Sequence, residues 1–272
     1  MGIKSFLKKH IVSPELDRQL NRIVKPVGSL GYDPWGFNAD SHKIFYALFR
    51  PFYEKYFRVE VHGIENVPDQ GRALLVANHS GQLPIDGVLI GFAMSERKHA
   101  PRLPRAMIER FFPTVPMLGN VLNQLGGVLG DPVNCGKMLE NEEVIAVFPE
   151  GIRGSGKPYK DRYQLKRFGN GFVHLAMKYN TPIIPVGVVG CEETIPAFAN
   201  IKPLARMLGI PYVPVALPFI FPAKVILNFG KPIHFENEEL TEDEIERRVE
   251  KVKSAIAELI AQGLEQREAV FA

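Results

Sequence analysis

Residues 73–86, which read ALLVANHSGQLPID, contain the pattern that decides the fold. The five small or apolar residues Ala73–Ala77 predict a buried strand that ends at Asn78. His79 then stands at the end of this strand, and Asp86 follows a short loop that contains glycine and proline. In α/β sheets, ligands and catalytic groups gather at the carboxyl ends of strands.

The pair His79 and Asp86 predicts a general base, because a carboxylate can fix the tautomer of an imidazole and stabilise the imidazolium. These residues also allow two other interpretations, neither of which is catalytic. Asp86 follows Pro84 and could cap a helix that begins near Gly87. A histidine at the end of a strand can also be a purely structural, hydrogen-bonded residue.

The composition is that of a folded protein with one large domain, or one domain with an appendage. The 272 residues are 46% hydrophobic and 23% charged, which excludes a disordered chain. A net charge of +3 and a pI near 8.7 suit anionic membranes or phosphate-bearing substrates without requiring them. The two cysteines, Cys135 and Cys191, have no spacing typical of a disulfide framework or a zinc site.

The hydropathy pattern predicts no membrane-spanning helix. No run of about 18 apolar residues occurs, and Pro218, Pro222 and Lys224 interrupt the nearest candidate at 215–227. The N-terminus is charged and lacks the apolar core of a signal peptide. We therefore expect a cytoplasmic protein that associates peripherally with the inner face of the membrane.

The N-terminal region, residues 1–58, is predicted to be helical and amphipathic. A helix is expected before Pro26, followed by a loop from Gly28 to Gly36. Residues 42–57 are rich in aromatic side chains at helical spacing, with a kink expected at Pro51. We expect this stripe to pack on the core, with part of the N-terminal region touching lipid at a membrane interface.

From Val59 onward, short apolar runs alternate with helical segments, which predicts a layered α/β domain over residues 59–235. The expected strands are 59–61, 73–77, 144–148, 182–189 and 225–229, and the expected helices are 87–94 and 168–179.

Residues 236–272 predict an amphipathic helix that docks on this domain. Thr241 and Glu244 form a capping box. One apolar stripe follows, made of Ile245, Val249, Val252, Ile256 and Leu259. A helix that binds a partner protein is the alternative.

A second motif, residues 148–157 (FPEGIRGSGK), follows the strongest predicted strand. It should place Glu150 and Arg153 at the same sheet edge as His79, where Arg153 could grip a phosphate or carboxylate. The alternative is a solvated basic loop. The segment also resembles a P-loop, but Pro158 stands where Ser or Thr must hold Mg²⁺, so a nucleotide triphosphatase is not expected. No G-x-S-x-G motif of a serine hydrolase occurs.

These motifs together resemble the glycerolipid acyltransferase superfamily, in its lysophospholipid or PlsC-like form. Asn78-His79 with Asp86, Phe148-Pro149-Glu150-Gly151-x-Arg153 and Pro182-Ile183-Ile184-Pro185-Val186 occur in the order and approximate spacing of that family. The resemblance covers residues 59–235 and is greatest to a branch similar to monoacylglycerol and diacylglycerol acyltransferases. Each motif alone is unspecific, but three in order identify the family.

The resemblance implies an α/β fold with a layered mixed sheet flanked by helices, and direct acyl transfer from acyl-CoA or acyl-carrier protein to a lipid hydroxyl. His79 would take the hydroxyl proton, and Asp86 would orient His79. The residues expected to bind substrate are Ser80, Glu150, Gly151, Arg153 and Lys157. Neither a metal nor a cofactor is expected beyond the acyl thioester. The expected partners are this donor, a lipid acceptor and a membrane surface, with no nucleic acid.

The sequence departs from the family pattern in two places. The family commonly has four residues between the histidine and the aspartate, whereas six separate His79 from Asp86, so either the loop folds differently or Glu150 serves His79. The segment 126–131 also lacks the arginine of phosphate-binding members, which favours a neutral acceptor, although the basic residues after Arg153 favour a phosphorylated one. The altered spacing supports a second hypothesis, a non-catalytic lipid-binding or membrane-scaffold protein with the same fold.

Overall fold

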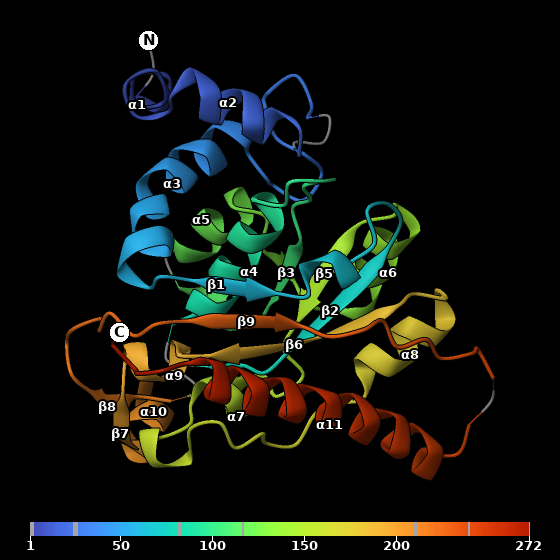
Figure 1. Ribbon diagram of the computed structural model, residues 1–272. Coiled ribbons are helices and arrows are strands. Elements are labelled where there is room, and N and C mark those ends of the chain that lie inside the picture. The colour runs from blue at the N-terminus through green and yellow to red at the C-terminus, as the bar shows by residue number, and fades with distance from the viewer. Residues whose placement is uncertain are drawn as a thin grey trace.

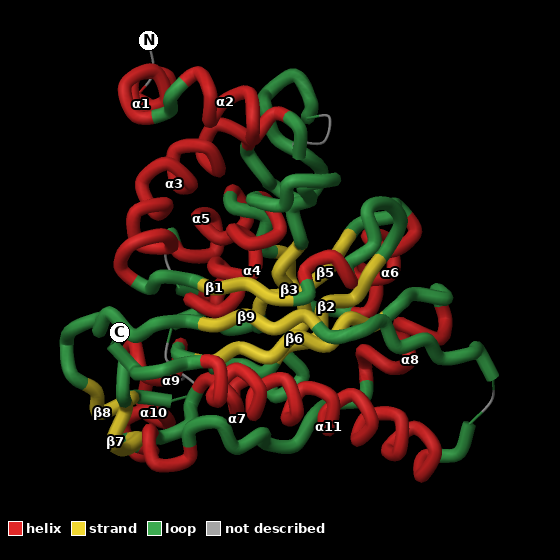
Figure 2. Tube along the Cα trace, in the orientation of Figure 1, coloured by secondary structure: helices red, strands yellow, loops and turns green. Residues whose placement is uncertain are grey.

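A computed structural model describes residues 3–23, 27–80, 83–115, 117–208, 212–238 and 240–271 of the chain. Within these ranges, seven strands form one mixed sheet in the order β1-β9-β6-β2-β5-β3-β4. Figures 1 and 2 show this sheet with helices on both sides. Their bounds are β1 Glu60–His62, β2 Ala73–Ala77, β3 Arg105–Ile108, β4 Val128–Leu129, β5 Val144–Val147, β6 Ile183–Val189 and β9 Ile226–Phe229. A separate two-stranded ribbon pairs β7 (Ala197–Asn200) with β8 (Pro214–Ala216).

Five adjacent strands, from β6 to β4 in that order, run parallel, whereas β9 is antiparallel to β6. Parallel strands need crossover connections, which explains the helices between them. The helices are α1 Ile3–Ile11, α2 Pro14–Asn21, α3 Ala39–Pro51, α4 Ile85–Ser95, α5 Leu118–Gln124, α6 Pro132–Glu140, α7 Ile152–Ser155, α8 Gly171–Lys178, α9 Cys191–Thr194, α10 Lys202–Leu208 and α11 Glu242–Gln266. The predicted α/β fold with a layered mixed sheet is confirmed.

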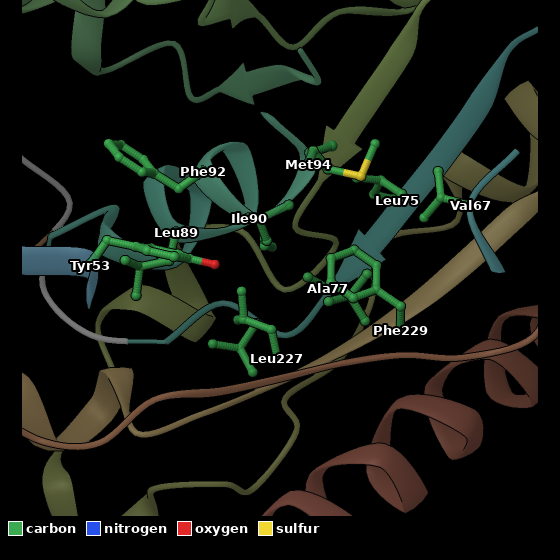
Figure 3. Close-up of a cluster of buried hydrophobic side chains, with 14 of the residues drawn as sticks. Tyr53, Val67, Leu75, Ala77, Leu89, Ile90, Phe92, Met94, Leu227 and Phe229 are labelled. Carbon is green, nitrogen blue, oxygen red and sulfur yellow. The ribbon is translucent and has the colours of Figure 1, made fainter. Parts of the chain in front are cut away.

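The side chains of β2 alternate between the two faces of the sheet. Leu75 and Ala77 pack with Leu89 and Phe92 of α4, as Figure 3 shows. The same cluster receives buried side chains from α2 and α3, so the N-terminal helices share a core with the sheet. Leu74 and its β2 neighbours on the opposite face pack instead with residues of α6, α8 and α11.

The C-terminal helix α11 begins with the predicted capping box of Thr241 and Glu244 and packs on β6 and β9. Its approach to β6 is close, because a Cβ atom at Gly187 would lie 2.6 Å from Cβ of Leu259. Figure 1 shows α11 with α8 on the side of the sheet away from α3.

The N-terminal region differs from the single helix expected before Pro26. The first helix, α1, ends at Ile11, and the side chain of Ser13 caps α2, whose first residue is Pro14. A proline fits the first turn of a new helix but breaks a continuing one. At Pro51, where a kink is predicted, α3 ends and a π-helix follows over Phe52–Tyr56. No helix in the described ranges is both long and apolar enough to cross a bilayer.

Candidate active site

The carboxyl ends of four parallel strands bring titratable side chains to one edge of the sheet. His79 follows β2, Glu109 follows β3, Glu150 follows β5 and Glu192 follows β6. Since these strands are parallel neighbours, the residues that follow them converge on a common crevice. The crevice is therefore the candidate site.

The imidazole of His79 contacts the carboxylate of Asp86, although six residues separate them. Nδ1 of His79 lies 2.7 Å from Oδ2 of Asp86, and this oxygen also accepts a hydrogen bond from the backbone N–H of Ser80 at 2.8 Å. The Asp86 side chain is fully buried in the first turn of α4. When Asp86 is ionised, Nδ1 carries the proton and the lone pair of His79 stands on Nε2.

Asp86 is not the N-cap of α4, which is Pro84, but its Oδ1 accepts the backbone N–H of Gly87 in the first turn at 2.7 Å. Residues 81 and 82, within the loop that joins His79 to α4, lie outside the described ranges.

Glu150 holds the backbone of His79 and not its imidazole. One carboxylate oxygen of Glu150 accepts the N–H of His79 at 3.0 Å, and the other accepts the N–H of Lys166 at 2.8 Å. The Glu150 side chain is fully buried. Of the two carboxylates considered as partners of the ring, Asp86 is the one that contacts it.

The pKa of His79 is raised above the ordinary value of 6.5 by its surroundings. Burial is the largest single influence and lowers the pKa, but the charge and hydrogen bond of Asp86 and the charges of Glu150 and Glu109 together outweigh it. These carboxylates favour the protonated ring. They would therefore stabilise an imidazolium that forms when His79 takes a proton.

Lys157 is buried close to two acidic side chains, Glu150 and Glu192. Its buried ammonium group donates to Glu192 at 2.8 Å and to the carbonyl of Gln164 at 3.3 Å, and it lies 3.5 Å from Glu150. An ammonium group in the interior requires such partners. Its charge joins the segment after β5 to helix α9, which follows β6, and a role of Lys157 in substrate binding stays a prediction.

Three other residues expected to bind substrate, Ser80, Gly151 and Arg153, differ in burial and in their contacts. Ser80 is buried, and its backbone holds Asp86. Gly151 has a positive φ of 54°, and a Cβ there would lie 2.7 Å from a carboxylate oxygen of Glu109, so the turn accepts only glycine without rearrangement. Arg153 is exposed and makes no ion pair with any residue of the described ranges.

Two apolar cavities share His79, Glu109 and Phe112 in their walls. The first cavity is narrow, about 120 Å³, and its walls come from α3, α4, β3 and α5. The second cavity is wider, about 550 Å³, and lies between the segment 111–118 and residues 212–220. Besides His79, Glu109 and Phe112, the wall of the second cavity contains Leu83, Ile195, Tyr212, Leu217, Phe219 and Ile220. The imidazole thus stands where two apolar spaces adjoin.

A third cavity, of about 620 Å³, also reaches Glu109 but carries polar side chains. Arg110, Asp131, His174 and Lys178 belong to its wall. Asp131 caps α6 by accepting the backbone N–H groups of Val133 and Asn134.

Sequence reasoning missed Glu109, which lines all three cavities. Glu109 follows β3, a four-residue strand that opens with Arg105 and was not predicted. Arg105 is buried between Asp33 and Glu143, so a charged residue in a buried strand conceals the apolar pattern. The sheet order, which no local pattern reveals, is what places Glu109 beside His79.

Comparison with known proteins finds one matching family model and several relatives. Residues 58–189 match the model of the Acyltransferase family. An uncharacterized protein of Mycobacterium tuberculosis is 38% identical over 217 residues, covering 76% of this chain and 60% of the relative. The human "DGAT1/2-independent enzyme synthesizing storage lipids" is 28% identical over 209 residues, covering 74% of this chain and 60% of the relative. The chain spans about 60% of the length of these curated relatives.

The fold is similar to that of the 1-acyl-sn-glycerophosphate (LPA) acyltransferase PlsC from Thermotoga maritima, with a TM-score of 0.53. The two sequences are 18% identical, and the match covers 84% of this chain and 83% of that chain. This likeness concerns the fold alone. The family match over residues 58–189 and this likeness of fold support the resemblance to the glycerolipid acyltransferase superfamily that the motifs predict.

Proposed function

We propose that this protein transfers a fatty acyl group from an acyl thioester to the hydroxyl of a glycerolipid or another lipid alcohol. The observation that carries the proposal is the position of His79, bound to Asp86 and lining two apolar cavities at once. One cavity can hold the acyl chain of the donor while the other holds the lipid acceptor. We assign the acyl chain to the first, narrower cavity.

In the proposed reaction, Nε2 of His79 takes the proton of the acceptor hydroxyl as its oxygen attacks the thioester carbonyl. The carbon–sulfur bond then breaks, and the departing thiolate receives the proton from the imidazolium. Asp86 orients the ring and stabilises its positive charge in between. Because a thiolate is a good leaving group, holding the two substrates against one base supplies the rate, and no cofactor is invoked.

We further propose that the acceptor is uncharged. The carboxylate of Glu109 lies in the walls around His79 and would repel a phosphate. Lys157, one of the basic residues that favoured a phosphorylated acceptor, is occupied by buried carboxylates. Arg110 and Lys178 in the wall of the third cavity suit the phosphates of an acyl-CoA donor instead.

A thioester-dependent acylation assay tests this function. Acyl-CoA or acyl-carrier protein is offered with glycerol-3-phosphate, lysophosphatidate, monoacylglycerol or diacylglycerol as acceptor. We expect transfer to at least one neutral acceptor and little to the phosphorylated ones. Liposome binding without transfer to any acceptor would favour the non-catalytic scaffold instead. The altered spacing that motivated that alternative does not prevent His79 from contacting Asp86.

Membrane attachment at the inner face remains a proposal with two candidate surfaces. Residues 1–58 expose Phe6 and Phe52, while the outer wall of the second cavity exposes Phe219 and Ile220. Truncating residues 1–58 would uncover the core they share with the sheet, so single changes are the better test. Flotation with anionic vesicles should weaken in Phe6→Ser and Phe52→Ser if the first surface binds lipid, and in Phe219→Ser if the second does.

A further inference from the structure

His42 is a buried histidine whose two ring nitrogens have no hydrogen-bond partner among the residues that the structure describes. It lies near the start of α3 and lines the first cavity, the same cavity that His79 lines. Buried polar groups are nearly always hydrogen-bonded in native proteins, so this ring calls for an explanation. The proposed transfer reaction does not use it.

The ring of His42 is neutral at physiological pH. Burial, and after it the positive charges of Arg105 and Lys43, lower its pKa from 6.5 to about 4. Both cations are bound by carboxylates of their own and not by the imidazole. A neutral imidazole offers one hydrogen-bond donor and one acceptor.

The first cavity follows one face of α4 away from His79. The residues of α4 in its wall are Gly87, Val88, Gly91 and Phe92, which recur at helical spacing. At about 1.5 Å per residue, the stretch from Pro84 to Phe92 spans about 12 Å. A Cβ added at Gly91 meets no atom within 4 Å, so the cavity passes directly over this residue.

The two histidines lie toward opposite ends of this face. At the start of α4, the ring of Phe148 lies 4.7 Å from that of His79. At the end of α4, Phe92 stacks on Tyr46 at 4.1 Å, and the Tyr46 ring lies 6.2 Å from that of His42. A chain whose thioester is at His79 therefore extends toward His42.

We propose that His42 binds a hydroxyl or oxo group on the acyl chain and so makes the first cavity selective for oxygenated acyl donors. The inference rests on the proposed function, since it assigns this cavity to the acyl chain. A plain hydrocarbon leaves the donor and acceptor of the ring unpaired, whereas an oxygen on the chain pairs with one of them. Rotation of the ring about its Cβ–Cγ bond selects the nitrogen that faces the chain. The Tyr46 hydroxyl donates its hydrogen to Glu96, so it has no hydrogen left to donate to an oxygen on the chain.

Displacement of a fluorescent fatty acid from the full-length protein tests the inference without requiring turnover. The competitors are hexadecanoic acid and a series of hydroxy- and oxo-hexadecanoic acids substituted at successive carbons. We expect the substituted acid to bind about tenfold more tightly than the plain acid, or about 1.4 kcal/mol, over one narrow range of positions. His42→Leu should abolish this preference. Tyr46→Phe, the matched control, should keep it.

A protein that prefers the plain acid at every position, or a preference that survives in His42→Leu, would overturn the inference. Kinetics with the matching CoA thioesters separate the two proposals. Selective binding without transfer would refute the transfer reaction alone, and transfer with no preference would refute the role of His42 alone.

Discussion

Lowering the pH should destabilise the folded protein through His42 by an amount that follows from the burial of its ring. The unfolded chain binds a proton on His42 near pH 6.5, whereas the folded protein resists this until about pH 4, because burial and the nearby charges of Arg105 and Lys43 oppose it. Between these values the unfolded state holds more protons, so stability is lost as the pH falls through 6.5 and the loss levels off below 4. At about 1.4 kcal/mol per pKa unit, the full loss is about 3 kcal/mol, and about 2 kcal/mol is reached by pH 5.

Urea unfolding at pH 7 and pH 5, with the wild type and His42→Leu side by side, measures this loss. His79 acts in the opposite sense, since its pKa is raised in the folded protein and its contribution is lost as the pH rises through that pKa. His79 is present in both proteins, so it cancels in the comparison. The variant should lose about 2 kcal/mol less than the wild type between the two pH values. Equal losses of unfolding free energy in the two proteins would refute the claim that burial lowers the pKa of His42.

Three further predictions concern the cavities and the buried charges. Gly91→Phe should cut kcat/KM about tenfold or more for hexadecanoyl-CoA relative to butanoyl-CoA, because its ring fills the first cavity, whereas Gly91→Ala should not. Equal losses of kcat/KM with both donors would count against the assignment of the acyl chain to the first cavity. Lys157→Met should lower the free energy of unfolding by about 3–5 kcal/mol in chemical denaturation, since it leaves Glu192 unpaired; no change would contradict the buried ion pair. Glu109→Gln should move the acidic limb of the pH–rate profile to lower pH, because losing a negative charge lowers the pKa of His79; a shift to higher pH would be inconsistent with it.

The parts of the fold that could be predicted are those whose local pattern agrees with their final environment. The strand at residues 73–77 could be predicted because its unbroken run of small and apolar residues matches a position where every side chain is buried. The helix α11 starts at its capping box and buries the predicted apolar stripe, apart from Leu259, which is only partly buried. In both cases a short segment carries the whole signal.

The unpredicted parts depend on contacts between distant segments. Lys157 stands in a basic run that is typical of a solvated loop, yet its ammonium group is paired with Glu192, which follows a different strand. Glu109 follows β3, and His79 follows β2. The two residues line the same cavities because β2, β5 and β3 are consecutive strands of the sheet. His42 opens the segment 42–57, whose aromatic stripe predicted packing on the core but gave no sign that a cavity passes beside it.

The central claim is that the imidazole of His79 deprotonates the acceptor. Its most direct test is the rate of acyl transfer by His79→Ala, measured with saturating acyl-CoA and the acceptor that the wild type uses, on protein shown by circular dichroism to be folded. Loss of a positioned general base should reduce kcat by about 10²- to 10⁴-fold. A folded His79→Ala protein that keeps wild-type turnover would contradict the account.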